Sequence, residues 1–271
     1  MKISPGKILV AVPAYNCENQ IARVINQINI RAQELIDTVV IIDNRSTDRT
    51  LTNAIEFGKK NFEKCNFLVL RNAKNFGLGG SHKVAFNYAI KHKFDYVVIM
   101  HGDDQGKFDD LYLIIKKNRH VKSDCILGSR FMTGSRLQGY SLFRTFGNVA
   151  YNKIFSFASN FNIKDLGSGL NLYKVKSLQN KFFIRFPDDL TFNYVMILAS
   201  IFLNQKIIFF PISWREDDQI SNVRLFNQAL KVLAILLYFT MNKYNFMNLD
   251  FRSFKFNLYD SKIMYRKILD A

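Results

Sequence analysis

The stretch of this sequence that decides the fold is Tyr96-Val97-Val98-Ile99-Met100-His101-Gly102-Asp103-Asp104-Gln105. Its first five residues are mostly apolar and indicate a buried strand, which runs directly into two carboxylates. Burying a carboxylate at the end of a strand costs free energy unless a cation lies beside it. Their hard oxygen atoms suit Mg²⁺ or Mn²⁺, and these ions commonly bring phosphates with them. A polar turn that caps the next helix is the alternative interpretation.

Apolar strands and amphipathic helices alternate on both sides of this stretch. Strands are predicted at residues 7–13, 38–43, 66–70, 96–100 and 124–129, and helices at 19–30, 50–60, 81–91 and 109–118. Continuous apolar strands that alternate with helices predict an α/β fold with a doubly wound, mostly parallel sheet. Beyond residue 130 we expect helices at 142–161, 190–203 and 223–239, strands at 169–173 and 206–214, and an aromatic, basic tail at 242–271.

The composition narrows the class of partner. Lys and Arg number 38 against 22 Asp and Glu, which gives a formal net charge of +16. This charge favours an anionic partner, such as nucleic acid, a phosphorylated substrate or anionic lipid. Cys17, Cys65 and Cys125 are widely spaced, which fits a reducing compartment better than a disulfide framework. The sequence shows no signal peptide and no run of about 18 apolar residues, so we expect a cytoplasmic protein.

Polar residues follow three of the predicted strands, at the edge where ligands bind in sheets of this kind. The three segments are Pro13-Ala14-Tyr15-Asn16, Asp43-Asn44-Arg45-Ser46 and the Asp103 cluster. A scatter of core residues would not place polar side chains at that edge three times. Acidic residues there would repel a phosphate backbone, so we do not expect a nucleic-acid-binding protein.

A glycine-rich turn, Gly77-Leu78-Gly79-Gly80, precedes the helix at 81–91. Amides at the start of a helix can approach a phosphate, although a plain helix-entry turn is the alternative. The turn follows the third strand and lacks the spacing of a dinucleotide fingerprint. A nicotinamide-dependent oxidoreductase is therefore not expected.

Taken in order, these segments resemble the family 2 glycosyltransferases with the GT-A fold, and most closely the dolichyl- or polyprenyl-phosphate sugar synthases. The matching segments are residues 12–16, 42–50, 75–79, 101–105, 128–130, 165–169 and 211–216. The resemblance covers about residues 7 to 225. It implies a glycosyltransferase domain at 1–222 and a helical, aromatic C-terminal extension at 223–271.

The resemblance also implies the reaction. An inverting, metal-dependent enzyme would move a sugar from a UDP- or GDP-sugar to a polyprenyl phosphate during cell-envelope glycan biosynthesis. Extension of a surface polysaccharide at a sugar hydroxyl is the alternative within the same family.

Nucleotide-binding residues follow from the matching segments. By resemblance they are Pro13, Ala14, Tyr15, Asn16, Glu18, Asp43, Asn44, Ser46, Gly77, Gly79, Asp103 and Arg215. Tyr15 would stack on the base, and Asp43 would accept a hydrogen bond from a base N–H. For Asp43, capping of the next helix is the alternative.

The metal ligands implied by the resemblance are Asp103, Gln105, His101 and Asp104, which would hold Mg²⁺ or Mn²⁺. His101 departs from the family pattern because it occupies the first Asp position of the D-x-D motif. A neutral His contributes no charge, and Asp104 would compensate for it.

The catalytic residues depend on the acceptor. By the same resemblance, Arg130 and Arg144 match arginines that hold the acceptor phosphate in the polyprenyl-phosphate sugar synthases. Pairing of each arginine with a nearby carboxylate is the alternative. Asp165 would hydrogen-bond within the acceptor loop. Asp188 and Asp189 lie where many family members carry the catalytic base, which a hydroxyl acceptor needs and a phosphate does not.

The helix at 223–239 and the basic, aromatic tail suit a peripheral contact with the inner face of a membrane. Packing in a homodimer and a plain core helix are the alternatives.

Overall fold

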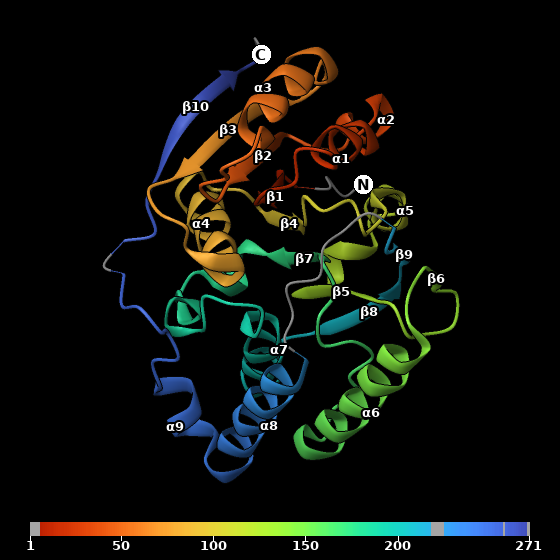
Figure 1. The fold of residues 1–271 in the computed structure, drawn as a ribbon, viewed down its shortest axis with the longest axis vertical. Helices are drawn as coiled ribbons and strands as arrows, with labels where there is room; N and C mark the ends of the chain where they lie inside the picture. Colours follow the sequence, from red (N-terminus) through yellow and green to blue (C-terminus); the bar gives the residue numbers. More distant parts are fainter. Residues whose placement is uncertain (1–5, 218–224, 257, 270–271) are drawn as a thin grey trace.

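The computed structural model describes residues 6–217, 225–256 and 258–269. Its centre is an eight-stranded sheet (Figure 1). The strands are β1 (Ile8–Ala14), β2 (Thr38–Asp43), β3 (Asn66–Asn72), β4 (Tyr96–Met100), β5 (Cys125–Ser129), β7 (Leu170–Lys174), β8 (Ile207–Pro211) and β10 (Ser261–Lys267). Their order across the sheet is β10-β3-β2-β1-β4-β7-β5-β8. A second, two-stranded parallel sheet pairs β6 (Arg136–Gln138) with β9 (Ser213–Arg215).

Most strand pairs in the main sheet are parallel. Strands β3, β2, β1 and β4 run parallel to one another, and β5 runs parallel to β8. Strand β7 runs antiparallel between β4 and β5, and β10 runs antiparallel along β3. This topology confirms the predicted doubly wound, mostly parallel sheet. The strand predicted at 206–214 is two strands, because after β8 the chain turns at Ile212 to pair with β6 in the other sheet.

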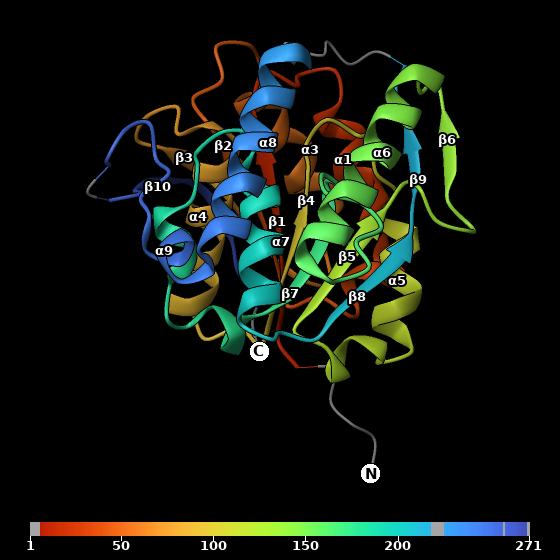
Figure 2. The same cartoon turned by 90° about the horizontal axis from the view of Figure 1, so that it is seen from below.

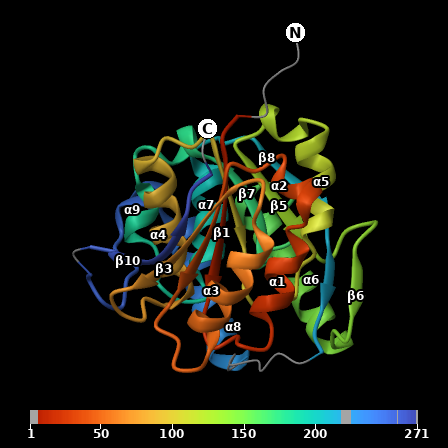
Figure 3. The same cartoon turned by 90° about the horizontal axis from the view of Figure 1, so that it is seen from above.

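Helices cover both faces of the sheet, as Figures 2 and 3 show from opposite sides. The α-helices are α1 (Ile21–Gln27), α2 (Ile30–Gln33), α3 (Thr50–Asn61), α4 (Gly77–Lys91), α5 (Phe108–Lys116), α6 (Leu142–Ser159), α7 (Phe192–Phe202), α8 (Leu225–Met241) and α9 (Lys243–Asn248). The helix predicted at 19–30 is two helices. The Asn29 side chain accepts hydrogen bonds from Arg31 N–H and Ala32 N–H, which starts α2 anew.

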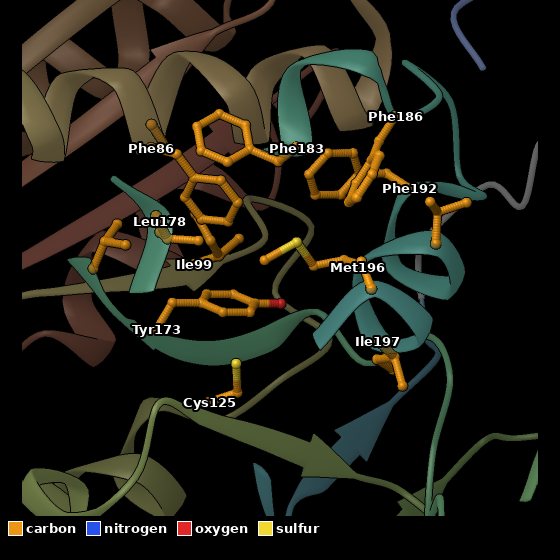
Figure 4. Packing of buried hydrophobic residues seen from close by; sticks show 14 of the residues in the cluster. Phe86, Ile99, Cys125, Tyr173, Leu178, Phe183, Phe186, Phe192, Met196 and Ile197 are labelled. Atoms are coloured by element: carbon orange, nitrogen blue, oxygen red, sulfur yellow. The ribbon is translucent and has the colours of Figure 1, made fainter. Parts of the chain in front are cut away.

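Alternate residues of the central strands enter two separate cores. On β1, Leu9 and Ala11 join one core, and Ile8, Val10 and Val12 join the other. Because both faces are buried, the strands read as continuous apolar runs in the sequence. The first core takes up much of the phenylalanine, and Figure 4 shows aromatic rings from several elements packed together. Phe86 on α4, for example, packs edge to face on Phe183, with ring centroids 5.0 Å apart.

The C-terminal residues return to the main sheet. Helix α8 packs against α6 and α7, and α9 follows directly. The chain then runs to the edge of the sheet, where β10 pairs with β3. The division at 222/223 stays a prediction. Among the described helices, none has the length and apolar character needed to cross a bilayer.

Candidate active site

The carboxyl ends of β1, β2 and β4 lie side by side, with β1 in the middle. Ala14 is in register with Asp43, at the ends of their strands. Asn44 N–H donates to Ala14 O at 2.8 Å, and Gly102 N–H donates to Pro13 O at 2.9 Å. The three polar segments that the sequence predicted at one edge are therefore joined by backbone hydrogen bonds.

One residue in each of these three loops has a left-handed backbone. Asn16, Arg45 and Asp104 have φ angles of +47°, +65° and +59°. This conformation is uncommon for residues with a Cβ, and it occurs often at active sites and ligand clamps.

Side chains lock the β1 and β2 loops together. Asn16 N–H donates to Ser46 Oγ at 3.1 Å, and Asn16 Oδ1 accepts from Thr47 N–H at 2.9 Å. A Glu18 carboxylate oxygen accepts from Arg49 N–H at 2.8 Å. Tyr15 projects from this fixed loop with 47% of its surface exposed, so its ring is accessible to a ligand.

Asp43 is fully buried at the end of β2. Its Oδ1 accepts a hydrogen bond from Ser46 N–H at 3.1 Å, which fixes the loop after β2; the next helix, α3, begins only at Thr50 and has no side-chain cap, so Asp43 does not cap it. Its Oδ2 forms an ion pair with Arg71 Nε at 3.1 Å but accepts no hydrogen bond from any described residue. Oδ2 therefore keeps a capacity to accept a further hydrogen bond.

Asn44 fastens the glycine-rich turn to the end of β2. Its Nδ2 donates to Asn75 Oδ1 at 2.8 Å and to Gly77 O at 3.3 Å. Gly79 N–H donates to Asp188 O at 2.8 Å, and a Cβ at Gly77 would collide with the same carbonyl oxygen. The structure thus shows the helix-entry alternative: the turn packs on a backbone carbonyl, and the Gly79 amide is occupied by it.

His101 is paired with a second histidine. The Nε2 atoms of His101 and His82 are 3.2 Å apart, so one imidazole donates to the other. Burial lowers the pKa of both rings, most strongly that of His82. Gly169 lies under the His101 ring, where a Cβ would come within 2.7 Å of His101 Nδ1. This packing does not favour the predicted metal-binding role of His101.

Asp103 follows His101 at the end of β4. Burial raises the pKa of its carboxyl group, although His101 and the Gln105 amide act in the opposite direction. Gln105 N–H donates to Asp103 Oδ1 at 3.2 Å. Within the part of the chain that the structure describes, no three His, Cys, Asp or Glu side chains form a ready metal site.

Asp104 turns away into a cluster of cations. Its Oδ2 binds Arg23 Nε at 2.6 Å and also contacts the Arg215 guanidinium. Its Oδ1 accepts from Gln27 Nε2 at 2.5 Å. With both oxygens occupied, Asp104 is a poor metal ligand, and the Arg215 guanidinium is bound to Asp104 and, among the described residues, to no diphosphate-binding partner that the sequence predicted. These two predictions are therefore not supported by the geometry.

Arg130 is buried in a bidentate pair with Asp165. Arg130 Nε donates to Asp165 Oδ2, and a second guanidinium nitrogen donates to Oδ1, both at 2.8 Å. Burial opposes the charge, but the Asp165 carboxylate keeps the pKa of Arg130 above its ordinary value. The guanidinium also lies over the Tyr140 and Trp214 rings. The carboxylate pairing that was the alternative for Arg130 is thus what the structure shows.

Arg144 lies in the first turn of α6 and is more accessible. Its guanidinium donates to Glu216 Oε2 at 2.5 Å and lies over the Tyr140 ring at 4.7 Å. Its side chain is 26% exposed, against 8% for Arg130. Gln105 Nε2 donates to the other oxygen of Glu216 at 3.4 Å, so Arg144 is linked to the loop that carries Asp103.

Asp188 belongs to a buried polar cluster. Lys83 Nζ on α4 donates to Asp188 Oδ1 at 2.6 Å and to Phe186 O at 2.6 Å. Tyr259 donates to the same Asp188 oxygen at 2.7 Å. Burial lowers the pKa of Lys83 to about 8, against the opposing effect of Asp188. The cluster holds the chain around Asp188 against α4 and the C-terminal segment.

The side chain of Asp189, in contrast, is 44% exposed. Its Oδ1 accepts from Thr191 N–H at 2.8 Å, and its Oδ2 forms an ion pair with Lys231 on α8. Partial burial would raise the pKa of Asp189, but the hydrogen bonds from Lys231 and Thr191 outweigh it and lower that pKa.

Several partners of the predicted residues were missed by sequence reasoning. They are His82, Lys83, Arg71 and Tyr259, and each contacts a residue far from it in the chain. The sequence gives no signal for Tyr259, which lies in a tail without clear periodicity. Lys83 carried a weak signal, because it interrupts the apolar positions of a helix that covers the sheet.

Two curated relatives are similar to parts of the chain. The UDP-N-acetylglucosamine–dolichyl-phosphate N-acetylglucosaminyltransferase of Methanococcus voltae is 24% identical over 64% of this chain and 71% of its own length. The dolichol-phosphate mannosyltransferase of Pyrococcus furiosus is 28% identical over 51% of this chain and 37% of its own length.

A solved structure is similar over most of the chain. It is glucosyl-3-phosphoglycerate synthase from Mycobacterium tuberculosis in complex with Mn²⁺, UDP-glucose and glycerol 3-phosphate. The TM-score is 0.57 at 13% identity, and the match covers 90% of this chain and 81% of that chain. At this identity the likeness shows the fold alone, and it confirms the predicted GT-A fold.

A family comparison covers the segments that the site uses. The family described as "Glycosyl transferase family 2" matches residues 9–182, from β1 to the segment before Asp188. The match includes the ends of β1, β2 and β4 and the Arg130–Asp165 pair, so the predicted family is confirmed. The chain therefore belongs to glycosyl transferase family 2.

Proposed function

We propose that this chain transfers a sugar from a nucleoside-diphosphate sugar to a polyprenyl phosphate. The observation that carries the proposal is that both candidate bases are ion-paired with lysines. Lys83 binds Asp188, and Lys231 binds Asp189. A carboxylate held by an ammonium group is a weak general base, and a phosphate acceptor needs no base. The names of the two archaeal relatives, which act on dolichyl phosphate, support the same acceptor class.

The donor nucleotide would bind across the ends of β1 and β2. Tyr15 offers an exposed ring for stacking on the base. Asp43 Oδ2 can accept a hydrogen bond from a base N–H, while Oδ1 keeps its bond to Ser46. Asn16, Glu18 and Asn44 act indirectly in this proposal, because their side chains hold the loops in place.

A divalent metal fits Asp103 better than the rest of the predicted set. Mg²⁺ is usually held by one or two carboxylates together with substrate phosphates and water, and does not need a cage of protein ligands. Asp103, with the Gln105 side chain beside it, supplies such a partial site, while Asp104 and His101 are occupied by other partners. A bound Mg²⁺ or Mn²⁺ would neutralise charge on the leaving diphosphate.

Arg144 is the best-placed cation for an acceptor phosphate. It is partly exposed, and among the described residues its ionic partner is Glu216. An arginine fork binds phosphate in a bidentate manner, so an incoming phosphate could replace that carboxylate. Arg130 would act indirectly, by keeping Asp165 and the aromatic rings around Arg144 in position.

Replacing Asp43 with Asn is expected to weaken nucleoside-diphosphate binding by about 1.5–3 kcal/mol, the range for a hydrogen bond to a charged group. Asn keeps the size of the side chain and an oxygen for Ser46 N–H, so the loop should keep its shape. Calorimetric titration with UDP and GDP measures the effect.

Asp124→Asn is the matched control for Asp43. Asp124 likewise accepts backbone hydrogen bonds at a strand end, from Lys206 N–H, but at the opposite edge of the sheet. Unchanged affinity in Asp43→Asn would show that Asp43 only caps the loop.

Replacing Arg144 with Ala is expected to reduce transfer to a polyprenyl phosphate by about 100-fold, because charged hydrogen bonds to phosphate are lost. Donor binding should be spared. Asp189→Asn should change transfer by less than about threefold, since a phosphate acceptor arrives already ionised. Product formation with a short-chain polyprenyl phosphate measures both variants.

The opposite pattern, an inactive Asp189→Asn and a tolerant Arg144→Ala, would favour the second candidate function, transfer to a sugar hydroxyl. The exposure of Asp189 is the observation that keeps this candidate open. Arg130 and Asp188 are unsuitable for the comparison, because their variants would break buried ion pairs.

A further inference from the structure

Helix α6 exposes a stripe of large apolar side chains. Phe143, Phe146 and Phe157 have 79%, 77% and 92% of their surface exposed, and Ile154 has 46%. These positions are three, eight and three residues apart, which places them along one face of the helix. The opposite face packs inward through Phe155. Isolated apolar residues on a surface are ordinary, but a continuous stripe of this kind marks an interaction site.

Helix α8 adds a second stripe. Leu230, Leu233, Leu237 and Met241 are exposed, and they recur at intervals of three or four residues. Val232, Ile235, Leu236 and Phe239 on the other side of the helix enter the core. Helix α8 therefore has one apolar face in the core and a second apolar face exposed to solvent. It is not the plain core helix that was one alternative from the sequence.

The two helices lie on the same side of the sheet. Figure 2 shows α6, α7 and α8 on one side of the sheet, and α6 and α8 contact each other. The first turn of α6 carries Arg144, and α8 carries Lys231, which binds Asp189. The exposed stripes thus begin beside the candidate acceptor site.

The segments that form the two helices carry charges of a single sign. Residues 125–164 and 219–249 contain no Asp or Glu, although the whole chain has 22. Lys153 on α6 and Lys243 after α8 are exposed beside the apolar residues. A two-fold symmetric dimer would place this surface against its own copy and bring the lysines of these helices together, with no carboxylate on either helix to pair with them. An anionic lipid surface matches both the apolar stripe and the positive charge.

We propose that the α6–α8 surface, defined by the exposed apolar residues of both helices, docks on an anionic membrane. The phenylalanine and leucine side chains enter the boundary between headgroups and acyl chains, and the lysines contact the lipid phosphates. This proposal goes beyond the transfer reaction, because it assigns a surface outside the site. It brings the first turn of α6, which carries Arg144, next to the bilayer.

Flotation of the full chain with vesicles tests the proposal. We expect binding to vesicles of mixed phosphatidylcholine and phosphatidylglycerol, with weaker binding to phosphatidylcholine alone and at high salt. The double variant Phe146→Glu/Phe157→Glu should lower the ratio of bound to free protein by about tenfold or more, because two apolar anchors are lost. Lys153→Glu should lower it less. Both side chains are exposed, so the fold should persist, and circular dichroism checks this.

Leu113→Glu is the matched control. Leu113 is 54% exposed on α5, whose buried face belongs to the core on the other side of the sheet, and its variant should float like the unmodified chain. Equal flotation of the double variant, or no flotation of the unmodified chain with any vesicle, would overturn the proposal. So would a dimer that sedimentation detects and Phe146→Glu dissolves, since that result assigns the surface to a second copy. The vesicles contain no polyprenyl phosphate, so these results are independent of the acceptor measured in the transfer assay.

Discussion

Asp103→Asn is expected to lower turnover by about 100-fold or more, the equivalent of at least about 2.7 kcal/mol in the barrier. Asp103 ends β4 at the edge where the diphosphate must be neutralised, and it is the predicted ligand that fits a metal best. Burial already raises the pKa of this carboxyl group, so a neutral Asn should not harm the fold. Sugar release from UDP- and GDP-sugars, with and without added Mn²⁺, measures the loss.

The control for this variant is Asp109→Asn, an exposed carboxylate in the first turn of α5. It should leave turnover unchanged. Full activity of the purified protein in excess chelator would contradict the metal assignment, even if Asp103→Asn were inactive.

Lys83→Met is expected to lower the free energy of unfolding by about 3–5 kcal/mol, the usual cost of removing one partner from a buried ion pair. Met fills most of the same volume, so the loss would come from Asp188, which would remain largely buried without its ammonium partner. Tyr259→Phe should cost only about 1 kcal/mol, the net value of one hydrogen bond. Urea denaturation curves give these differences.

Lys91→Met on the exposed end of the same helix is the control, and it should change stability by less than about 0.5 kcal/mol. Adding Asp188→Asn to Lys83→Met should recover part of the loss, because the unpaired charge is then removed. A single Lys83→Met variant as stable as the unmodified chain would show that the cluster contributes nothing to folding.

The parallel part of the fold could be predicted because its buried strands appear in the sequence as continuous apolar segments. Residues 96–100 are apolar throughout, since neighbouring strands and helices cover both faces. Strand β10 could not be predicted in the same way. Its residues, Ser261–Lys267, mix charged and apolar side chains, and they become a strand only because the open edge of β3 is available to them. Strand pairing between segments so far apart leaves little local signal.

The location of the site was predictable and its internal contacts were not. Parallel strands bring their carboxyl ends to one edge, so the neighbourhood of Asp43 and Asp103 follows from topology. The direction of each side chain depends on single backbone angles. At Asp104 a φ of +59° accompanies a carboxylate that binds Arg23 and Arg215, although its neighbour Asp103 was predicted to share its role. Arg130 likewise pairs with Asp165, which lies 35 residues further along the chain, so sequence spacing could not indicate the pair.

The late position of β10 in the sequence has a consequence for biosynthesis. A ribosome delivers β1 to β4 long before residues 261–267 emerge, so the β3 edge stays unpaired for most of synthesis. An unpaired edge offers backbone N–H and C=O groups to other nascent chains. The yield of native protein would then depend on how quickly the last strand reaches that edge, and on chaperones that shield it meanwhile.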